Sequence, residues 1–350
     1  MYVYARKVVK NNNDDALRFF FYQMSECSPE LSEEYEVAQL FFNPLCSDAV
    51  RVQFLPTFNR MVHSEEAVET DIGAVFALRK QKNPTLFDGS KFRFHSCTSS
   101  SGDAASAGGA GSEVAVLSLG LTSYGTFLGT NYGRIQQRLR EDGIQEHGNP
   151  QAFFSDPLGV GAMLRTKDNV YICIERSQTV GEFAGYIDGP GGHPEPGKIG
   201  IALDYLTQCD PGRYADVGDE VRCQLDDGNV EKIAKSAVVA ELFDSITSEV
   251  CDEINVPRES LSDPLLMGIA RQTASFGRPA LSFYIECKLD RKEVLELYKE
   301  GPAEADESVK LLFLPASVLA EAGGTGYKGD LKLTPALKAA VYILGKTAMG

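Results

Sequence analysis

The sequence GPGGHPEPGKIG, residues 189–200, places two glycines directly before a histidine and a glutamate that prolines flank. A turn needs Gly and Pro for its backbone geometry, but it does not need His193 and Glu195 as well. Glycine also lets a ligand approach the backbone closely. We therefore expect this turn to face a ligand. Which ligand it binds depends on a helix that is predicted further along the chain, over residues 236–256.

That helix is predicted by an apolar stripe that recurs every three or four residues. Pro257 ends the pattern, and Asn255 suits a C-terminal cap with a left-handed backbone. The stripe consists of Val239, Leu242, Phe243, Ile246, Val250 and Ile254.

The polar face of the same helix carries three carboxylates, Glu249, Asp252 and Glu253. Residues three and four positions apart are neighbours on a helix, so we expect the three to form one patch. Like charges repel there unless a cation compensates them, and carboxylate oxygens suit Mg²⁺ or Mn²⁺. Taken alone, such a patch also fits a solvated helix face.

The composition limits the class of partner. The chain has 350 residues, of which 43% are hydrophobic, and a formal net charge of −15. This charge argues against binding to nucleic acid or to an anionic membrane, and we expect no membrane-spanning segment. The eight cysteines form no C-x-x-C pair and the N-terminus lacks the features of a secretory signal. We therefore expect reduced cysteines and a cytoplasmic protein, with a nuclear location left open.

The order of predicted elements indicates an α/β or α+β fold with helices on a mixed sheet. Residues 1–150 are predicted to form an N-terminal α+β region, in which the Ser/Gly/Ala-rich segment 98–112 is a flexible loop joining two strands. Residues 151–350 are predicted to form the second domain. Within it, the polar passage 201–232 shows little periodicity and is interpreted as an insertion.

The Pro-Gly-Gly turn and the acidic helix together resemble the Nudix hydrolase signature, G-x5-E-x7-R-E-U-x-E-E-x-G-U, where U is aliphatic. SEVCDEINV, residues 248–256, fits the second half of that signature. Glu249 takes the position of the R-E glutamate, and Asp252 and Glu253 take the E-E pair.

The match departs from the signature in four ways. Ser248 replaces the arginine, Asn255 replaces the last glycine, and Glu241 lies one residue out of register with the first glutamate. Glu249 also follows Gly192 by 57 positions, far more than the signature allows. With Ser248 at the arginine position, the Arg-Glu ion pair that usually stabilises the helix of the signature cannot form.

Longer segments narrow the resemblance to one subgroup, the UDP-sugar diphosphatases with an atypical Nudix box. These segments are GGHPEP, LTSYGTFLGTN (121–131), SDPLGVGAML (155–164) and DPLLMGIAR (263–271). The resemblance implies a Nudix α/β/α sandwich with an N-terminal extension. It also implies an enzyme that uses Mg²⁺ to hydrolyse UDP-glucose or UDP-galactose to UMP and a sugar 1-phosphate.

The resemblance assigns roles to individual residues. Glu249, Asp252 and Glu253 would hold the metal, and Glu249, Glu253 or Glu307 would act in catalysis. Each substrate residue also has an ordinary structural interpretation, such as core packing, a turn cap or a surface charge. The substrate residues implied are His193, Glu195 and Arg176 for the diphosphate, Phe87 and Tyr124 for uracil, Asp188 for a sugar or base donor, and Arg271 for the site or as a helix brace.

Two other functions remain open on the sequence. One is a Nudix hydrolase for another nucleoside diphosphate derivative, such as ADP-ribose or a dinucleotide. The other is a catalytically silent nucleotide-binding module, which the departures at Ser248 and Glu241 would suit. In each case the expected partner is a small nucleotide, and the chain could be a monomer or a homodimer.

Overall fold

The computed structural model describes residues 34–101, 113–178, 183–201, 216–217, 220–224, 230–302, 308–324 and 329–349. Glu307, most of the passage 201–232 and the greater part of the predicted loop 98–112 lie outside these residues. Residues 31–350 form one compact unit. None of the helices in the described ranges is long and apolar enough to span a membrane.

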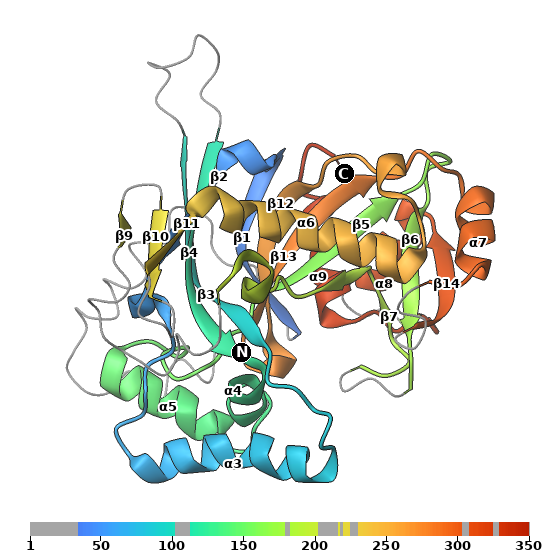
Figure 1. Ribbon diagram of the computed structural model, residues 1–350. Helices are drawn as coiled ribbons and strands as arrows, with labels where there is room; N and C mark the ends of the chain where they lie inside the picture. The colour runs from blue at the N-terminus through green and yellow to red at the C-terminus, as the bar shows by residue number, and fades with distance from the viewer. Residues whose placement is uncertain are drawn as a thin grey trace, which may run out of the picture. The chain divides into compact units, whose positions relative to one another are not determined.

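The centre of the fold is an eight-stranded mixed sheet with the order β1-β12-β13-β5-β6-β14, in which β7 pairs with β6 and β8 with β5 (Figure 1). Only the β13–β5 pair is parallel. The strands are β1 (Tyr35–Leu45), β5 (Gly159–Arg165), β6 (Tyr171–Arg176), β7 (Ile187–Asp188), β8 (Gly191–Gly192), β12 (Leu265–Gln272), β13 (Arg278–Glu286) and β14 (Ser308–Leu314).

Helices cover both faces of this sheet. Along β5, Ala162 and Leu164 belong to the core that contains the apolar stripe of α6 (Lys235–Ile254), whereas Met163 belongs to the core of α9 (Pro335–Leu344). Successive side chains of a strand point to opposite faces, so α6 and α9 lie on opposite sides of the sheet. The predicted α/β/α sandwich is confirmed.

The sequence located α6 almost to the residue. Every member of its predicted apolar stripe is buried. Asn255 has the left-handed φ of 61° that its role as a cap requires, and its N–H donates to the carbonyl of Cys251 at 2.9 Å. Its side-chain amide also donates to the carbonyl of Leu297 at 2.6 Å, which ties the end of α6 to α7 (Arg291–Lys299).

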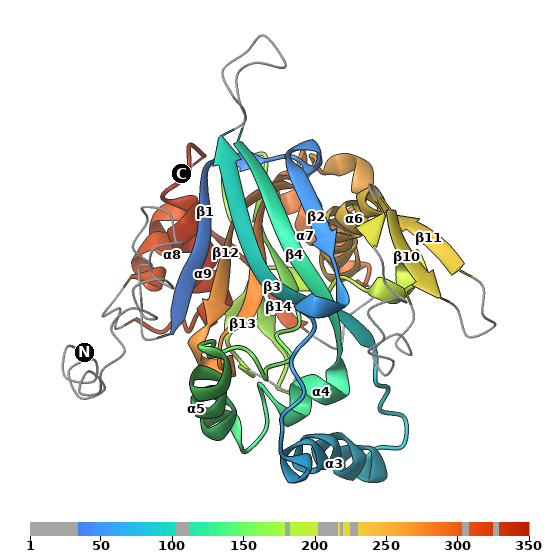
Figure 2. The same cartoon turned by 90° about the vertical axis from the view of Figure 1, so that its left-hand side faces the viewer.

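The N-terminal region forms a second sheet with the order β2-β4-β3, which faces the viewer in Figure 2. The predicted hairpin is confirmed, because β3 and β4 pair antiparallel as far as Ser101 and Glu113. β1 instead joins the central sheet beside β12, so the two regions share that sheet. The elements are β2 (Val50–Phe54), α3 (Glu66–Lys82), β3 (Ser90–Ser101), β4 (Glu113–Ser123), α4 (Tyr124–Gly129) and α5 (Gln136–His147).

Two further segments form short elements. The segment after Ser123 forms the short helix α4, and the Ser123 hydroxyl caps it by accepting a hydrogen bond from the N–H of Thr126. In the passage 201–232, the described residues contribute strands to a small antiparallel sheet. Its strands are β9 (Asp216–Val217), β10 (Glu220–Gln224) and β11 (Val230–Ala234).

A buried polar cluster connects the N-terminal region with the central sheet. The carboxylate of Asp156 is fully buried. It accepts hydrogen bonds from the side chain of Asn131 at 2.9 Å and from Arg271 at 3.2 Å. The buried guanidinium of Arg93 adds further positive charge and donates to three backbone carbonyls. Buried charges need such partners, so this cluster fixes the two regions together.

Candidate active site

One face of α6 lies along the turn 189–195. Glu241 and Glu253 are both buried there, and each accepts a backbone hydrogen bond from the turn. The N–H of Gly191 donates to Oε2 of Glu253 at 2.9 Å, and the N–H of Glu195 donates to Oε1 of Glu241 at 2.8 Å. Side chains four residues apart share one face of a helix. The members of this face are Glu241, Ser245, Glu249 and Glu253.

Both glycines of the turn lie very close to neighbouring atoms. A Cβ atom at Gly192 would overlap the carboxylate of Glu249, and a Cβ atom at Gly191 would overlap the backbone carbonyl of Val160 on β5. The turn therefore passes directly between the Glu249 side chain and the central sheet. This explains in physical terms why Gly-Gly precedes His193.

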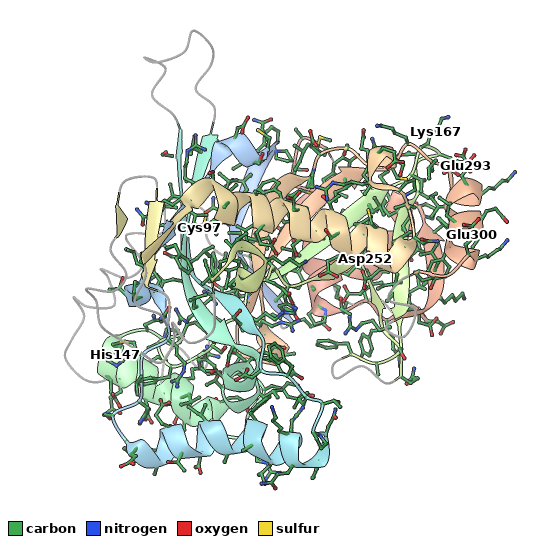
Figure 3. All side chains as sticks on the ribbon, viewed as in Figure 1. Cys97, His147, Lys167, Asp252, Glu293 and Glu300 are labelled. Carbon is green, nitrogen blue, oxygen red and sulfur yellow. The ribbon has the colours of Figure 1, made fainter. Side chains whose placement is uncertain are left out.

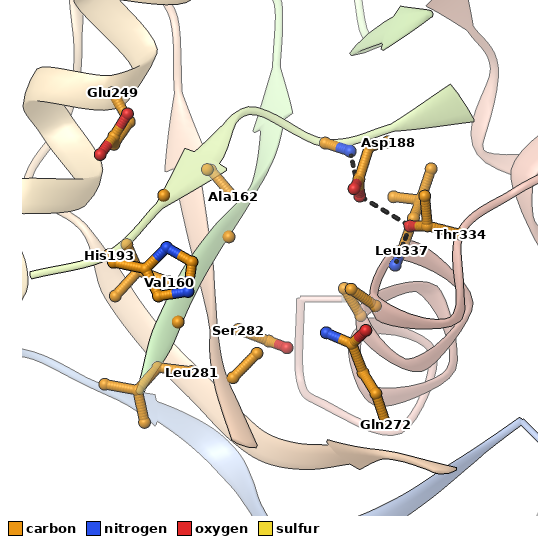
Figure 4. Close-up of a pocket in the computed structure, with 18 of the residues that line it drawn as sticks. Val160, Ala162, Asp188, His193, Glu249, Gln272, Leu281, Ser282, Thr334 and Leu337 are labelled. Carbon is orange, nitrogen blue, oxygen red and sulfur yellow. Dashed lines mark hydrogen bonds between the residues drawn. The ribbon is translucent and has the colours of Figure 1, made fainter. Parts of the chain in front are cut away.

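The turn borders a pocket of about 300 Å³ (Figure 4). Glu249 and His193 lie on one side of the pocket, and Asp188 and Thr334 lie on the other. Its basic lining residues, Lys91, Arg176 and Arg278, come from β3, β6 and β13.

A second hollow of about 340 Å³ shares His193 and these three cations with the first. Its remaining wall comes from the N-terminal region and carries the aromatic side chains of Tyr124, Phe127 and Tyr132. Phe127 and Tyr132 are stacked, with ring centroids 6.2 Å apart. The two hollows thus meet at a positively charged centre.

His193 is neutral at physiological pH. Burial, together with the charges of Arg278, Lys91 and Arg176, lowers its pKa from the ordinary value to about 3. A neutral imidazole can donate one hydrogen bond and accept another. The three cations supply the positive charge of the centre, which suits an anionic ligand.

Most of the predicted substrate residues meet at this centre. Asp188 lies 3.6 Å from Arg176 and accepts hydrogen bonds from the Thr334 hydroxyl at 2.8 Å and the N–H of Gly189 at 3.0 Å. Burial raises the pKa of Asp188, and Arg176 opposes that shift. The Glu195 carboxylate lies 3.2 Å from the Lys91 ammonium.

Three predicted residues have other surroundings. Asp252 is exposed and lines a different hollow, beside Ser248 and Asn255; it is marked in Figure 3. The Phe87 side chain is 78% exposed. Arg271 binds Asp156 and the carbonyl of Gly277.

The donor set fits a divalent cation only in part. Glu249 and Glu253 supply hard oxygen donors on consecutive turns of α6. Glu249 lines the charged pocket, whereas Glu253 is buried and accepts a hydrogen bond from the N–H of Gly191. Asp252 does not join them, since it lines another hollow. In the described ranges no group of three or more His, Cys, Asp or Glu side chains has an arrangement that could hold a metal ion.

Sequence reasoning missed the other members of the centre. Lys91, Arg278, Tyr132 and Thr334 carry no motif of their own and lie up to 243 positions apart in the chain. Packing of β3 and α4 beside the central sheet brings them together. The sequence around each of these residues does not show which distant residues will lie beside it in the fold.

Comparison with known proteins places the chain in a family. It is 39% identical over 243 residues to the uridine diphosphate glucose pyrophosphatase NUDT22 of Homo sapiens, covering 69% of this chain and 71% of that protein. It is 36% identical to the Bos taurus protein of the same name, covering 85% and 91%. Nudix hydrolase 9 of Arabidopsis thaliana is 32% identical, with 79% and 83% covered.

The chain belongs to the Nudix hydrolases. It is therefore an enzyme. Members of this family generally use divalent metal ions, which agrees with the two carboxylates beside the glycine turn.

No family model matches the sequence. Among solved structures, the chain is similar to a Nudix hydrolase from M. smegmatis, with 11% identity, a TM-score of 0.29 and 54% and 83% of the two chains covered. It is also similar to DR0079 from Deinococcus radiodurans, with 14% identity, a TM-score of 0.28 and 54% and 82% covered. The family assignment rests on the curated relatives.

Proposed function

We propose that this protein hydrolyses the diphosphate bond of UDP-sugars, UDP-glucose and UDP-galactose among them, to UMP and a sugar 1-phosphate. The names of the mammalian relatives support this substrate class. The structural observation that carries the proposal is the position of Glu249 and Glu253 against the Gly191–Gly192 turn, beside three cations. We further propose a soluble cytoplasmic enzyme that acts as a monomer or homodimer.

The charged centre suits the diphosphate. Lys91, Arg176 and Arg278 would neutralise its oxygens, and neutral His193 would donate one hydrogen bond without adding charge. The glycine turn lets the Glu249 carboxylate lie close to the backbone at the edge of the pocket. Glu195, which pairs with Lys91, would hold that ammonium group in position.

Hydrolysis adds water across the bridging P–O bond, so that one phosphate leaves with uridine and the other with the sugar. Glu249 and Glu253 would hold Mg²⁺ or Mn²⁺, which supplies charge neutralisation and lowers the pKa of a bound water. A carboxylate must accept the proton of the attacking water, and Glu249 is our candidate. Glu307, the second sequence-based candidate, lies outside the described residues.

The aromatic hollow suits the base. Tyr124, with Phe127 and Tyr132, offers ring surfaces on which uracil can stack. Phe87, the other residue expected to contact uracil, is exposed and is not among the residues that line this hollow.

Product analysis tests the function. UDP-glucose, UDP-galactose, ADP-ribose and GDP-mannose are incubated with the enzyme in Mg²⁺, and again with EDTA. We expect UMP and glucose 1-phosphate from UDP-glucose, and neither product with EDTA. Cleavage of ADP-ribose without cleavage of any UDP-sugar would overturn the substrate class. Binding of UDP-glucose without turnover of any substrate would favour a silent nucleotide-binding module.

A further inference from the structure

The pocket extends beyond the charged centre into a hollow between the central sheet and the start of α9. Small residues form its floor, because Gly161 on β5 stands in register with Ser282 on β13, and Gly159 with Ala280. A Cβ atom at Gly161 would meet no atom within 4 Å, so the space above it is open. The opposite wall is the first turns of α9, which contribute Ala336, Leu337 and Ala340.

Two buried polar side chains face this hollow. Gln272 is 2% exposed and Ser282 is 4% exposed, and both line the pocket (Figure 4). The Gln272 side chain accepts one long bond of 3.4 Å from Arg278, and its amide nitrogen donates to no described residue. A side-chain amide and a hydroxyl at the wall of a pocket can each form hydrogen bonds, so these two are suited to a ligand that carries polar groups.

Asp188 supplies an acceptor on the far wall. Its carboxylate already binds the Thr334 hydroxyl and the N–H of Gly189, and a carboxylate has capacity for further donors. Its other neighbour, Arg176, lines both hollows. The hollow beside Gly161 and α9 therefore adjoins the charged centre. A carboxylate, an amide and a hydroxyl around an apolar Leu337 match a ligand that carries several hydroxyl groups.

We propose that this hollow, bounded by Gly161, Ser282, Gln272, Asp188 and α9, binds the sugar half of the nucleotide sugar and determines which sugar is accepted. This inference rests on the proposed function and extends it. The aromatic hollow then takes the base, and the diphosphate lies between the two, beside His193.

Binding of the two product halves tests the assignment. The affinities of glucose 1-phosphate and UMP are measured by calorimetry in Mg²⁺ for the wild type, Gly161→Val and Ser282→Ala. Valine at 161 would fill the hollow, so we expect the glucose 1-phosphate Kd to rise at least about tenfold, with the UMP Kd changed by less than about twofold. Gly73→Val in α3 is the matched control, because a Cβ atom there also meets no atom within 4 Å.

Other outcomes would overturn the assignment. A UMP affinity that falls in place of the glucose 1-phosphate affinity would put the base in this hollow. A wild-type protein that binds UMP but not glucose 1-phosphate would also refute a sugar site. If Gly161→Val disturbs the fold, Ser282→Ala, which removes only the hydroxyl oxygen, provides the test. It should weaken the binding of glucose 1-phosphate and leave the binding of UMP unchanged. UDP-glucose hydrolysis is assayed in parallel, so a wild type that binds both halves but does not hydrolyse the substrate contradicts the proposed function alone.

Discussion

Gly192 shows how the absence of a single Cβ atom fixes the position of a carboxylate, that of Glu249, which we propose to act in catalysis. Gly192→Ala would push the Glu249 carboxylate aside, because the new Cβ atom would occupy its position. The Glu249 side chain is flexible at that end, so we expect a normal melting temperature. We expect kcat for UDP-glucose to fall by about 10- to 100-fold, the cost of a misplaced catalytic group.

Gly197→Ala is the control for this prediction. Gly197 lies in the same turn region, and a Cβ atom there would meet nothing within 4 Å. Its kcat should match that of the wild type. Equal activity of both variants would show that Glu249 need not keep its observed position.

His193 predicts a pH effect on stability. The folded protein holds its pKa at about 3, whereas the unfolded chain has the ordinary value of about 6.5. As the pH falls through 6.5, the unfolded state binds a proton that the folded state does not, so stability is lost below that pH and is unaffected above it.

We therefore expect the metal-free wild type to lose up to about 2 kcal/mol more than His193→Gln between pH 7.5 and pH 5. Urea unfolding at the two pH values, in EDTA, measures the difference. Identical losses in both proteins would mean that His193 takes up its proton in the folded state.

At the scale of elements, α6 was predictable because its signal is local. The apolar stripe, Pro257 and the Asn255 cap all lie within the helix or beside it. The sequence could not predict which of the helix's carboxylates would face the turn. Adjacent residues point about 100° apart on a helix, and only packing against the sheet decides that Glu253 faces inward while Asp252 faces solvent.

The contact of α6 with the turn gives a prediction at this scale. Glu241→Ala would remove the buried carboxylate that accepts a hydrogen bond from the N–H of Glu195, at a cost of about 1–3 kcal/mol. Asp244→Ala on the exposed face of the same helix removes only a surface pair with Arg258, which is worth about 0–1 kcal/mol. Urea unfolding of the two variants should separate them, and equal losses would contradict a structural role for the turn contact.

At the scale of the whole molecule, the cluster around Asp156 holds the N-terminal region against the central sheet. Asp156→Asn would keep the backbone, since Asn tolerates the observed φ of 44°, but it would leave Arg271 and Arg93 without a counter-charge. We expect a loss of about 3 kcal/mol in the free energy of unfolding. Asp168→Asn, at an exposed pair with Arg291, should cost less than about 1 kcal/mol.

The site as a whole could be predicted only in outline. The turn and α6 carry motifs, so both could be recognised in the sequence. Lys91, Arg278 and Gln272 belong to three different strands, and nothing in their neighbouring residues distinguishes them from surface or core positions. Their convergence depends on the strand order β12-β13-β5 and on β3 from the second sheet, which periodicity alone does not determine.

We propose that Glu249, which lies against Gly192, acts in the hydrolysis of UDP-glucose while Asp252 of the same helix does not. The most direct measurement is the turnover of UDP-glucose in Mg²⁺ by Glu249→Gln and Asp252→Asn, two substitutions that each remove one charge. We predict a loss of at least about 100-fold in kcat for Glu249→Gln and less than about threefold for Asp252→Asn. Full activity in Glu249→Gln, or an equal loss in both variants, would contradict the account.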